Sequence, residues 1–139
     1  MSLSIRNQLS GIVTASTPGE VMATVKVRLT GGQNLTAAIT LEAAEDLGLA
    51  AGTAVRALVK STEVSLATAP VDGLSIRNQL PGTISDIATG GAMAAVRIGI
   101  EGADLTAVIT MDAVTELGLT TGIPVVALIK STEVSLATA

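Results

Sequence analysis

The feature that most constrains this chain is an internal repeat, because its 139 residues contain two copies of one sequence unit. Residues 4–9 return unchanged as residues 75–80, and residues 60–69 return unchanged as residues 130–139. The separation of matching residues falls from 71 to 70 along the chain, so one residue is missing from the second copy near Gly31, where a turn would allow it. A repeat of this kind means that one small fold is made twice.

The repeat also predicts how the chain is divided into domains. We expect one domain at residues 1–69, a linker at 70–74 that contains Pro, Asp and Gly, and a second domain at 75–139. Each domain has about 65 residues, a size at which one hydrophobic core is marginal and oligomerisation commonly helps. Apolar residues make up 48% of the chain, and we expect much of this apolar excess to lie in subunit interfaces.

Within one copy, the hydrophobic pattern predicts five short strands and one helix. The strands are expected at residues 5–15, 21–29, 35–39, 53–59 and 62–68. Thr40 stands where an N-cap belongs, before a helix over 41–47 that Gly48 ends. The predicted fold class is therefore all-β, with two tandem five-stranded Greek-key barrels of the OB type. The alternative, a small sandwich, has no evident place for the helix.

The composition argues against several classes of function. The chain has no His and no Cys, so it lacks the usual general base and the usual zinc ligands, and we do not expect an enzyme. It has no aromatic residue on which a nucleic-acid base could stack, and its net charge is −4. The sequence therefore argues against an OB protein that binds nucleic acid. No apolar run is long enough to span a bilayer and no signal peptide is evident, so we expect a cytoplasmic location and no membrane partner.

Two polar groups recur in both copies although a barrel does not require them. They are a Ser-x-Arg-Asn group at the start of each copy and a Lys-Ser group near its end. The residues are Ser4, Arg6, Asn7, Lys60 and Ser61 in the first copy, and Ser75, Arg77, Asn78, Lys130 and Ser131 in the second. Guanidinium, ammonium and hydroxyl groups together make a receptor for a small oxyanion.

Two other interpretations of these groups remain open at the level of the sequence. Arg6 could pair with Glu63 across strands, and Lys60 could be a solvated turn residue. The identity of residues 60–69 and 130–139 could instead reflect a strand that pairs across a symmetric interface without any ligand.

The order of the repeated motifs resembles a known family. Ser-x-Arg-Asn-Gln-Leu-x-Gly, Leu-Thr-Ala-x-Ile-Thr, Leu-Gly-Leu-x-x-Gly and Lys-Ser-Thr-x-Val occur in this order in each copy, and together they resemble the Mop domain of molbindins. The resemblance implies an OB-type module that binds molybdate, and tungstate similarly, for intracellular storage and homeostasis. It also implies a homo-oligomer, a trimer of two-domain chains with the oxyanion held at interfaces between modules.

The resemblance assigns the site residues as well. It implies that the ten residues of the two polar groups bind molybdate together with Thr40 and Thr110 at the helix starts. A related regulator has a serine three residues after this threonine, where this chain has Ala43 and Ala113, so we expect Thr40 to matter less than Arg6 and Lys60. The sequence shows no helix-turn-helix region and no ATPase motif, which favours storage. The alternative is a molybdate-dependent regulatory or delivery protein that docks on a partner.

Overall fold

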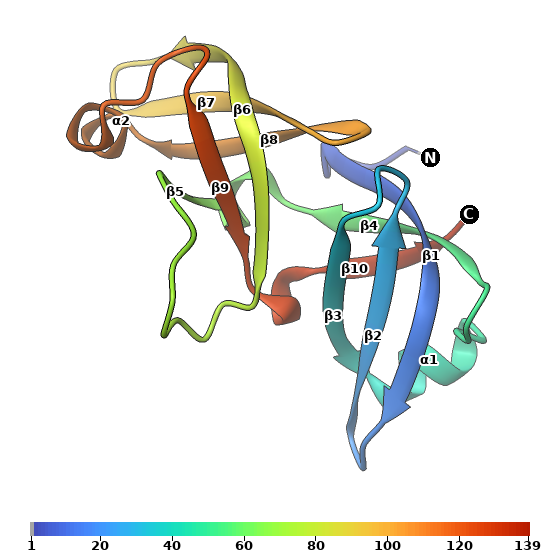
Figure 1. Cartoon of the computed structure of the whole chain (residues 1–139). Helices are drawn as coiled ribbons and strands as arrows, with labels where there is room; N and C mark the ends of the chain where they lie inside the picture. The colour runs from blue at the N-terminus through green and yellow to red at the C-terminus, as the bar shows by residue number, and fades with distance from the viewer. Residues whose placement is uncertain (1) are drawn as a thin grey trace.

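The computed structural model describes residues 2–139 as two curled sheets of five strands that lie side by side (Figure 1). The first copy contributes β1 (Asn7–Pro18), β2 (Met22–Leu29), β3 (Asn34–Thr40), β4 (Ala54–Val59) and β5 (Ser65–Ala67). The second contributes β6 (Asn78–Thr89), β7 (Met93–Ile100), β8 (Ala103–Thr110), β9 (Pro124–Ile129) and β10 (Ser135–Thr138). The predicted all-β class with two tandem OB-type barrels is confirmed.

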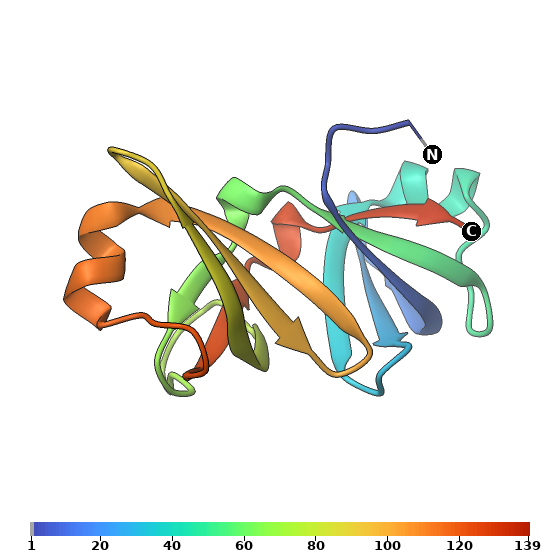
Figure 2. The ribbon, with the colours of Figure 1, turned by 90° about the horizontal axis from the view of Figure 1, so that it is seen from above.

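Each copy also has one short α-helix and one 3₁₀ turn. The α-helices are α1 (Leu41–Asp46) and α2 (Met111–Leu117), and each follows the third strand of its copy, as the sequence predicts. The 3₁₀ turns are η1 (Ser61–Glu63) and η2 (Ser131–Glu133). The two α-helices lie at the outer ends of the molecule, far from the region where the barrels meet (Figures 1 and 2). Within residues 2–139, every helix falls short of the length and apolar character needed to cross a bilayer.

The strands form because their apolar residues alternate with polar ones. Along β2 the side chains are alternately exposed and buried from end to end, and Val25 is fully buried. Its neighbours in the core include Leu9 and Leu35, which are 2% and 1% exposed. Burial of one such side chain stabilises the fold by about 1.5–3 kcal/mol. The buried residues of both sheets form one continuous cluster. The two barrels therefore have a common hydrophobic core.

The last strand of each copy belongs to the sheet of the other copy. The strand orders are β10-β4-β1-β2-β3 and β5-β9-β6-β7-β8. Thus β5 runs antiparallel to β9, with Leu66 opposite Ala127, and β10 runs antiparallel to β4, with Leu136 opposite Ala57. Figure 2 shows both strands crossing from one barrel to the other. The unchanged sequence of residues 60–69 and 130–139 therefore matches a strand that pairs across a symmetric interface.

This exchange changes how the predicted domain limits relate to the sheets. The sequence copies end at residues 69 and 139, but each sheet takes four strands from one copy and one from the other. The predicted fifth strand over 62–68 is shorter, because residues Ser61–Glu63 form a 3₁₀ turn before β5 begins at Ser65. The turn directs the chain away from its own barrel and toward the neighbouring one.

A glycine allows the first strand of each copy to bend between two partners. Strand β1 pairs with β4 up to Ile12 and with β2 from Gly11 onward. A Cβ atom on Gly11 would lie 2.6 Å from Val27 Cγ1 and 2.7 Å from the carbonyl oxygen of Arg28. Gly82 has the same place in β6, with contacts of 2.6 and 2.7 Å to β7. Only glycine fits this close approach of two strands.

We predict that Gly11→Ala destabilises the protein by about 1–3 kcal/mol, because the added methyl group overlaps atoms of β2. Urea unfolding followed by circular dichroism measures the change. Gly91→Ala is the matched control, since a Cβ atom there has nothing within 4 Å. Equal stability of the two variants would show that β1 and β2 are not in close contact at Gly11.

Candidate functional site between the two copies

The register of β1 and β4 places the two predicted cationic residues at one end of a strand pair. Asn7, the first residue of β1, pairs with Val59, the last residue of β4. Arg6 and Lys60 lie one residue beyond this pair, so they leave the ladder at the same end. Both side chains are exposed. The second copy repeats the arrangement, because Asn78 pairs with Ile129 and leaves Arg77 beside Lys130.

Most of the polar residues predicted in the first copy line one hollow. Its volume is about 340 Å³, and it is lined by Ser4, Ile5, Arg6, Lys60, Ser61, Thr62 and Val108. Four of these are predicted site residues. The guanidinium of Arg6 donates a hydrogen bond to the carbonyl of Leu3. Val108 comes from β8 of the other copy, so the hollow lies between the copies. No sequence motif had indicated Val108 as a site residue.

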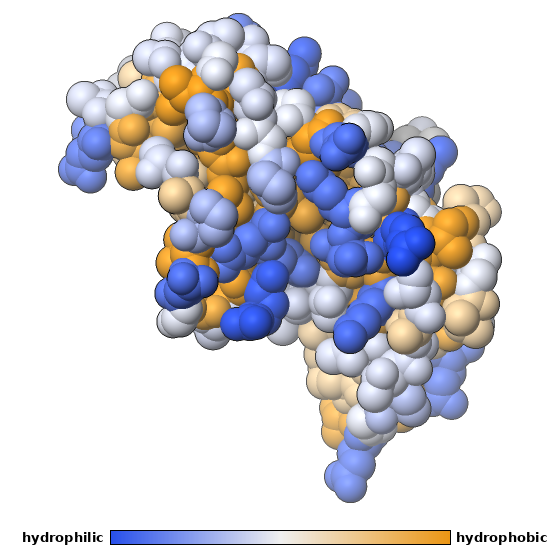
Figure 3. Space-filling view, in the orientation of Figure 1, coloured by the Kyte–Doolittle hydropathy of each residue, from blue (hydrophilic) through white to orange (hydrophobic). Residues whose placement is uncertain are grey.

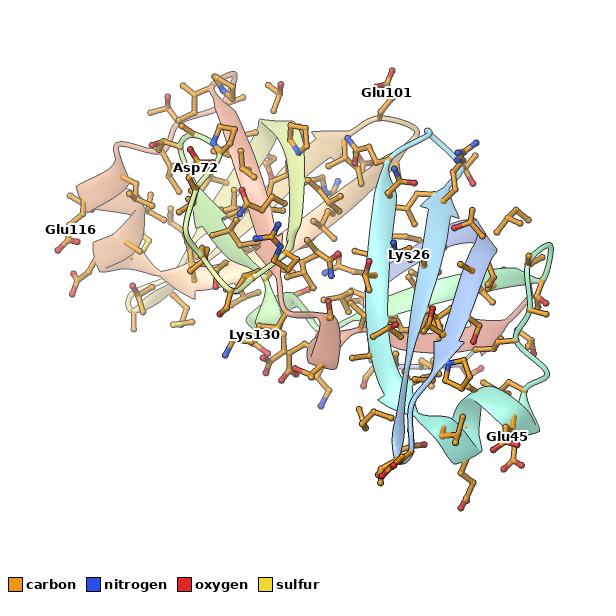
Figure 4. All side chains as sticks on the ribbon, turned by 60° about the horizontal axis from the view of Figure 1, so that its bottom comes forward. Lys26, Glu45, Asp72, Glu101, Glu116 and Lys130 are labelled. Atoms are coloured by element: carbon orange, nitrogen blue, oxygen red, sulfur yellow. The ribbon has the colours of Figure 1, made fainter. Side chains whose placement is uncertain are left out.

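The other copy contributes a wall because each 3₁₀ turn packs against the third strand of the neighbouring barrel. Turn η1 contacts β8, and turn η2 contacts β3 in the same manner. Figure 4 shows Lys130 in the region where the barrels meet, whereas Glu45 and Glu116 lie on the helices at the two ends. The signal that could have identified this wall is the repeated Leu-Thr-Ala-x-Ile-Thr segment, which forms β3 and β8.

Asn7 and Asn78 use their side chains to join the two copies. Nδ2 of Asn7 donates to the carbonyl of Thr106 at 2.8 Å, and Oδ1 accepts from the backbone N–H of Thr106 at 2.8 Å. Asn78 makes the same two bonds to Thr36, at 2.8 and 2.9 Å. The two asparagines are 3% and 4% exposed. Both amides thus satisfy the backbone of the strand that faces them, and direct contact with a ligand remains a prediction.

The helix-start threonines serve as N-caps. The hydroxyl of Thr40 accepts from the backbone N–H of Ala43 at 3.1 Å, and Thr110 does the same for Ala113. Thr40 lines a different hollow from Arg6, and that hollow also contains the acidic residues Glu20, Glu42, Glu45 and Asp46. Within one chain, the structure does not bring Thr40 together with Arg6 and Lys60.

The hollow beside Arg6 offers hydrogen-bond donors. A guanidinium, an ammonium and two serine hydroxyls can all donate to the oxygens of an anion. Lys60 also lines a neighbouring hollow of about 140 Å³, which Glu133 lines as well. Among residues 2–139, no three His, Cys, Asp or Glu side chains are grouped so that they could hold a metal ion.

The comparison with protein families agrees with the repeat. The model of the TOBE domain matches residues 3–66 and again residues 74–136. The chain belongs to the TOBE-domain family. Each sequence copy is thus one TOBE domain, although the last strand of each domain completes the sheet of the other.

Individual relatives match one or both copies of this chain. The solved structure of the cytoplasmic molybdate-binding protein ModG, with molybdate bound, is 42% identical, covers 100% of both chains and has a TM-score of 0.96. The molybdenum transport protein ModE of Azotobacter vinelandii is 42% identical over 99% of this chain and 51% of its own length. Molybdenum-pterin-binding protein 3 of Clostridium pasteurianum is 46% identical over 48% of this chain and 97% of its own length. This chain spans about half the length of the ModE relative.

We predict that Thr40→Ala lowers the free energy of unfolding by about 1 kcal/mol, because the first-turn N–H of Ala43 loses its acceptor. Chemical denaturation measures this change. Thr40→Ser keeps the oxygen and should retain most of the stability. If the alanine and serine variants were equally stable, the hydroxyl would contribute nothing as a cap.

Proposed function

We propose that this chain binds molybdate, and its analogue tungstate, as an intact oxyanion, and that it stores and buffers molybdate in the cytoplasm without catalysing a reaction. The observation that carries the proposal is the hollow in which Arg6, Lys60 and Ser61 meet between the copies. The full-length similarity to ModG, a protein described as cytoplasmic and molybdate-binding, supports both the ligand and the location.

The donor set suits a tetrahedral dianion. Four oxygens need several donors at once, and Arg6, Lys60, Ser4 and Ser61 line one hollow. A hydrogen bond to a charged group contributes about 1.5–3 kcal/mol. Three or four such bonds, less the cost of association, correspond to a dissociation constant on the order of micromolar. The net charge of −4 does not prevent this, because two cations in one hollow outweigh a diffuse surface charge.

We also propose that the chain assembles into a homotrimer, which would place six copies of the domain in one particle. Several large apolar side chains support an assembly, because they are exposed in the single chain. The most exposed are Val21 at 73%, Ile12 at 45%, Met93 at 43% and Met22 at 42%. On the face in Figure 3, hydrophobic residues form several separate areas among hydrophilic ones. Burial of such residues is typical of subunit interfaces.

A regulatory or delivery function is the second candidate, and the similarity to ModE supports it. The two functions differ in what the ligand changes. A store should fill its sites and keep its surface unchanged. A regulator should expose or order a surface away from the hollow, which hydrogen exchange with and without molybdate would detect. Ligand-dependent protection confined to Arg6, Lys60 and their neighbours would favour storage.

We predict that replacing both Lys60 and Lys130 by Ala weakens molybdate binding about tenfold or more, because the hollow beside Arg6 and the equivalent Lys-Ser group of the second copy each lose an ammonium group. Calorimetric titration with molybdate in the presence of sulfate measures the affinity. Lys26→Ala is the matched control, since Lys26 is an exposed cation on β2. All three proteins should elute alike in gel filtration.

Two results would contradict the proposal. Absence of binding heat, together with no molybdenum retained by the wild-type protein after gel filtration, would remove the proposed ligand. Unchanged affinity in the double variant would show that the two lysines are ordinary surface residues.

A further inference from the structure

The strands of the first sheet present positive charges outward and no carboxylate. Lys26 and Arg28 lie on β2 and Arg56 lies on β4, and each alternates with buried core residues. The five strands of this sheet contain no Asp and no Glu. Because β1 lies between β4 and β2, Arg56 and Arg28 flank the outer side of β1. On a chain whose net charge is −4, this is a local concentration of positive charge.

The second sheet does not keep two of these charges, although it comes from the same sequence unit. The residue that corresponds to Arg28 is Gly99, and the residue that corresponds to Arg56 is Val126. Val126 is only 4% exposed, so this part of β9 is covered. The outer faces of the two sheets therefore offer different surfaces to a partner.

The third cation also has different surroundings in the two copies. Lys26 corresponds to Arg97 in the sequence. Arg97 of β7 lies opposite Asp86 of β6, so a carboxylate stands beside it. Lys26 of β2 lies opposite Ala15 of β1. The first copy thus carries unneutralised positive charge at a place where the second copy carries a pair of opposite charges.

The second sheet holds an extended segment of its own chain through a glutamine. Gln79 Oε1 accepts from the backbone N–H of Val71 at 3.0 Å, and Nε2 donates to the carbonyl of Val71 at 2.8 Å. Val71 belongs to the linker at 70–74. Gln79 lies on the outer side of β6, because it alternates with the buried residues of that strand. A side-chain amide that bonds both backbone groups of one residue acts as a strand neighbour would.

Gln8 has the same place in the first sheet, but its amide holds no such segment. Its Nε2 donates to the carbonyl of Ile5 at 3.1 Å, and its Oε1 accepts from Nη1 of Arg56 at 3.4 Å. These are the partners of the Gln8 amide among residues 2–139. Gln8 and Ser10 line a hollow of about 260 Å³, which Glu101 of the other copy lines too. Figure 4 shows the Glu101 side chain pointing away from the sheets at the tip of its turn.

We propose that the outer face of the first sheet docks an extended, acidic segment of a partner protein, in the manner in which the second sheet holds its own linker. The amide of Gln8 pairs with the backbone of this segment. Arg56 and Arg28 bind its carboxylates, because a guanidinium donates two parallel hydrogen bonds to one carboxylate. The second sheet has Val126 in place of Arg56, so an apolar side chain suits that face and an acidic one suits this face.

The test titrates the isotope-labelled full chain with the peptide Ala-Pro-Glu-Asp-Glu-Leu, which is the sequence of residues 69–74 with its third and fifth residues changed to Glu. Backbone amide shifts in NMR spectra locate the peptide and give its dissociation constant. We expect saturable shifts at Gln8, Ser10 and Arg56 that diminish as the ionic strength rises, and no shifts at the corresponding residues of the second sheet. The neutral peptide Ala-Pro-Gln-Asn-Gln-Leu is the control and should not bind.

Variants separate recognition of charge from loss of structure. Arg28→Gln combined with Arg56→Gln should weaken binding of the acidic peptide about fivefold or more, because two ion pairs are removed. Arg97→Gln is the matched control on the second sheet and should leave peptide binding unchanged. Ala15→Asp gives the first sheet the carboxylate that the second sheet carries, so it should weaken peptide binding as well. All these variants should bind molybdate as the wild type does, because none of the changed residues lines the hollow of the candidate site.

Several results would overturn the inference. The acidic peptide does not bind, the neutral peptide binds equally well, or the shifts are as large on the second sheet as on the first. Unchanged affinity in the double arginine variant would also contradict it. If that variant had a different molecular mass without peptide, the face would be an interface between copies of this chain and not a docking face. Loss of molybdate binding with peptide binding intact would contradict the proposed function alone.

Discussion

The pairing of each final strand with the other copy is the interaction on which the rest of the structure depends. Neither four-strand set is complete, because β4 requires β10 and β9 requires β5 as neighbours. The exchange brings each 3₁₀ turn against the third strand of the opposite barrel. The same contact places Lys60 and Ser61 beside Val108, so the candidate site is a product of the exchange.

The asparagine side chains stabilise this contact at the outer edge of each third strand, where no further strand of the sheet pairs. A third strand has backbone groups on its outer edge that no strand of its own sheet pairs with. The amides of Asn7 and Asn78 supply one donor and one acceptor to Thr106 and Thr36, in the geometry of a strand neighbour. Support for the interface and organisation of the hollow are therefore provided by the same short segment, in which arginine and asparagine are adjacent.

Much of this structure could be predicted from the sequence, because the repeat and the alternation are local signals. The order of strands, the helix after Thr40 and the proximity of Arg6 to Lys60 follow from pattern and register. The destination of the fifth strand could not be predicted. Residues 60–69 and 130–139 are identical, so their residues do not distinguish one barrel from the other. The burial of Asn7 was missed for a related reason, since its partner lies 99 residues away.

The continuous core has a consequence for how this molecule responds to damage. Leu136 of the second copy lies opposite Ala57 of the first, and Leu66 lies opposite Ala127. If one copy opened, it would withdraw a strand from its neighbour and leave a bare sheet edge there. The two copies therefore unfold together as one cooperative unit, although each is a separate unit in the sequence. A destabilising substitution in either copy therefore lowers the stability of both. A change in one copy must also remain compatible with the strand that it receives from the other.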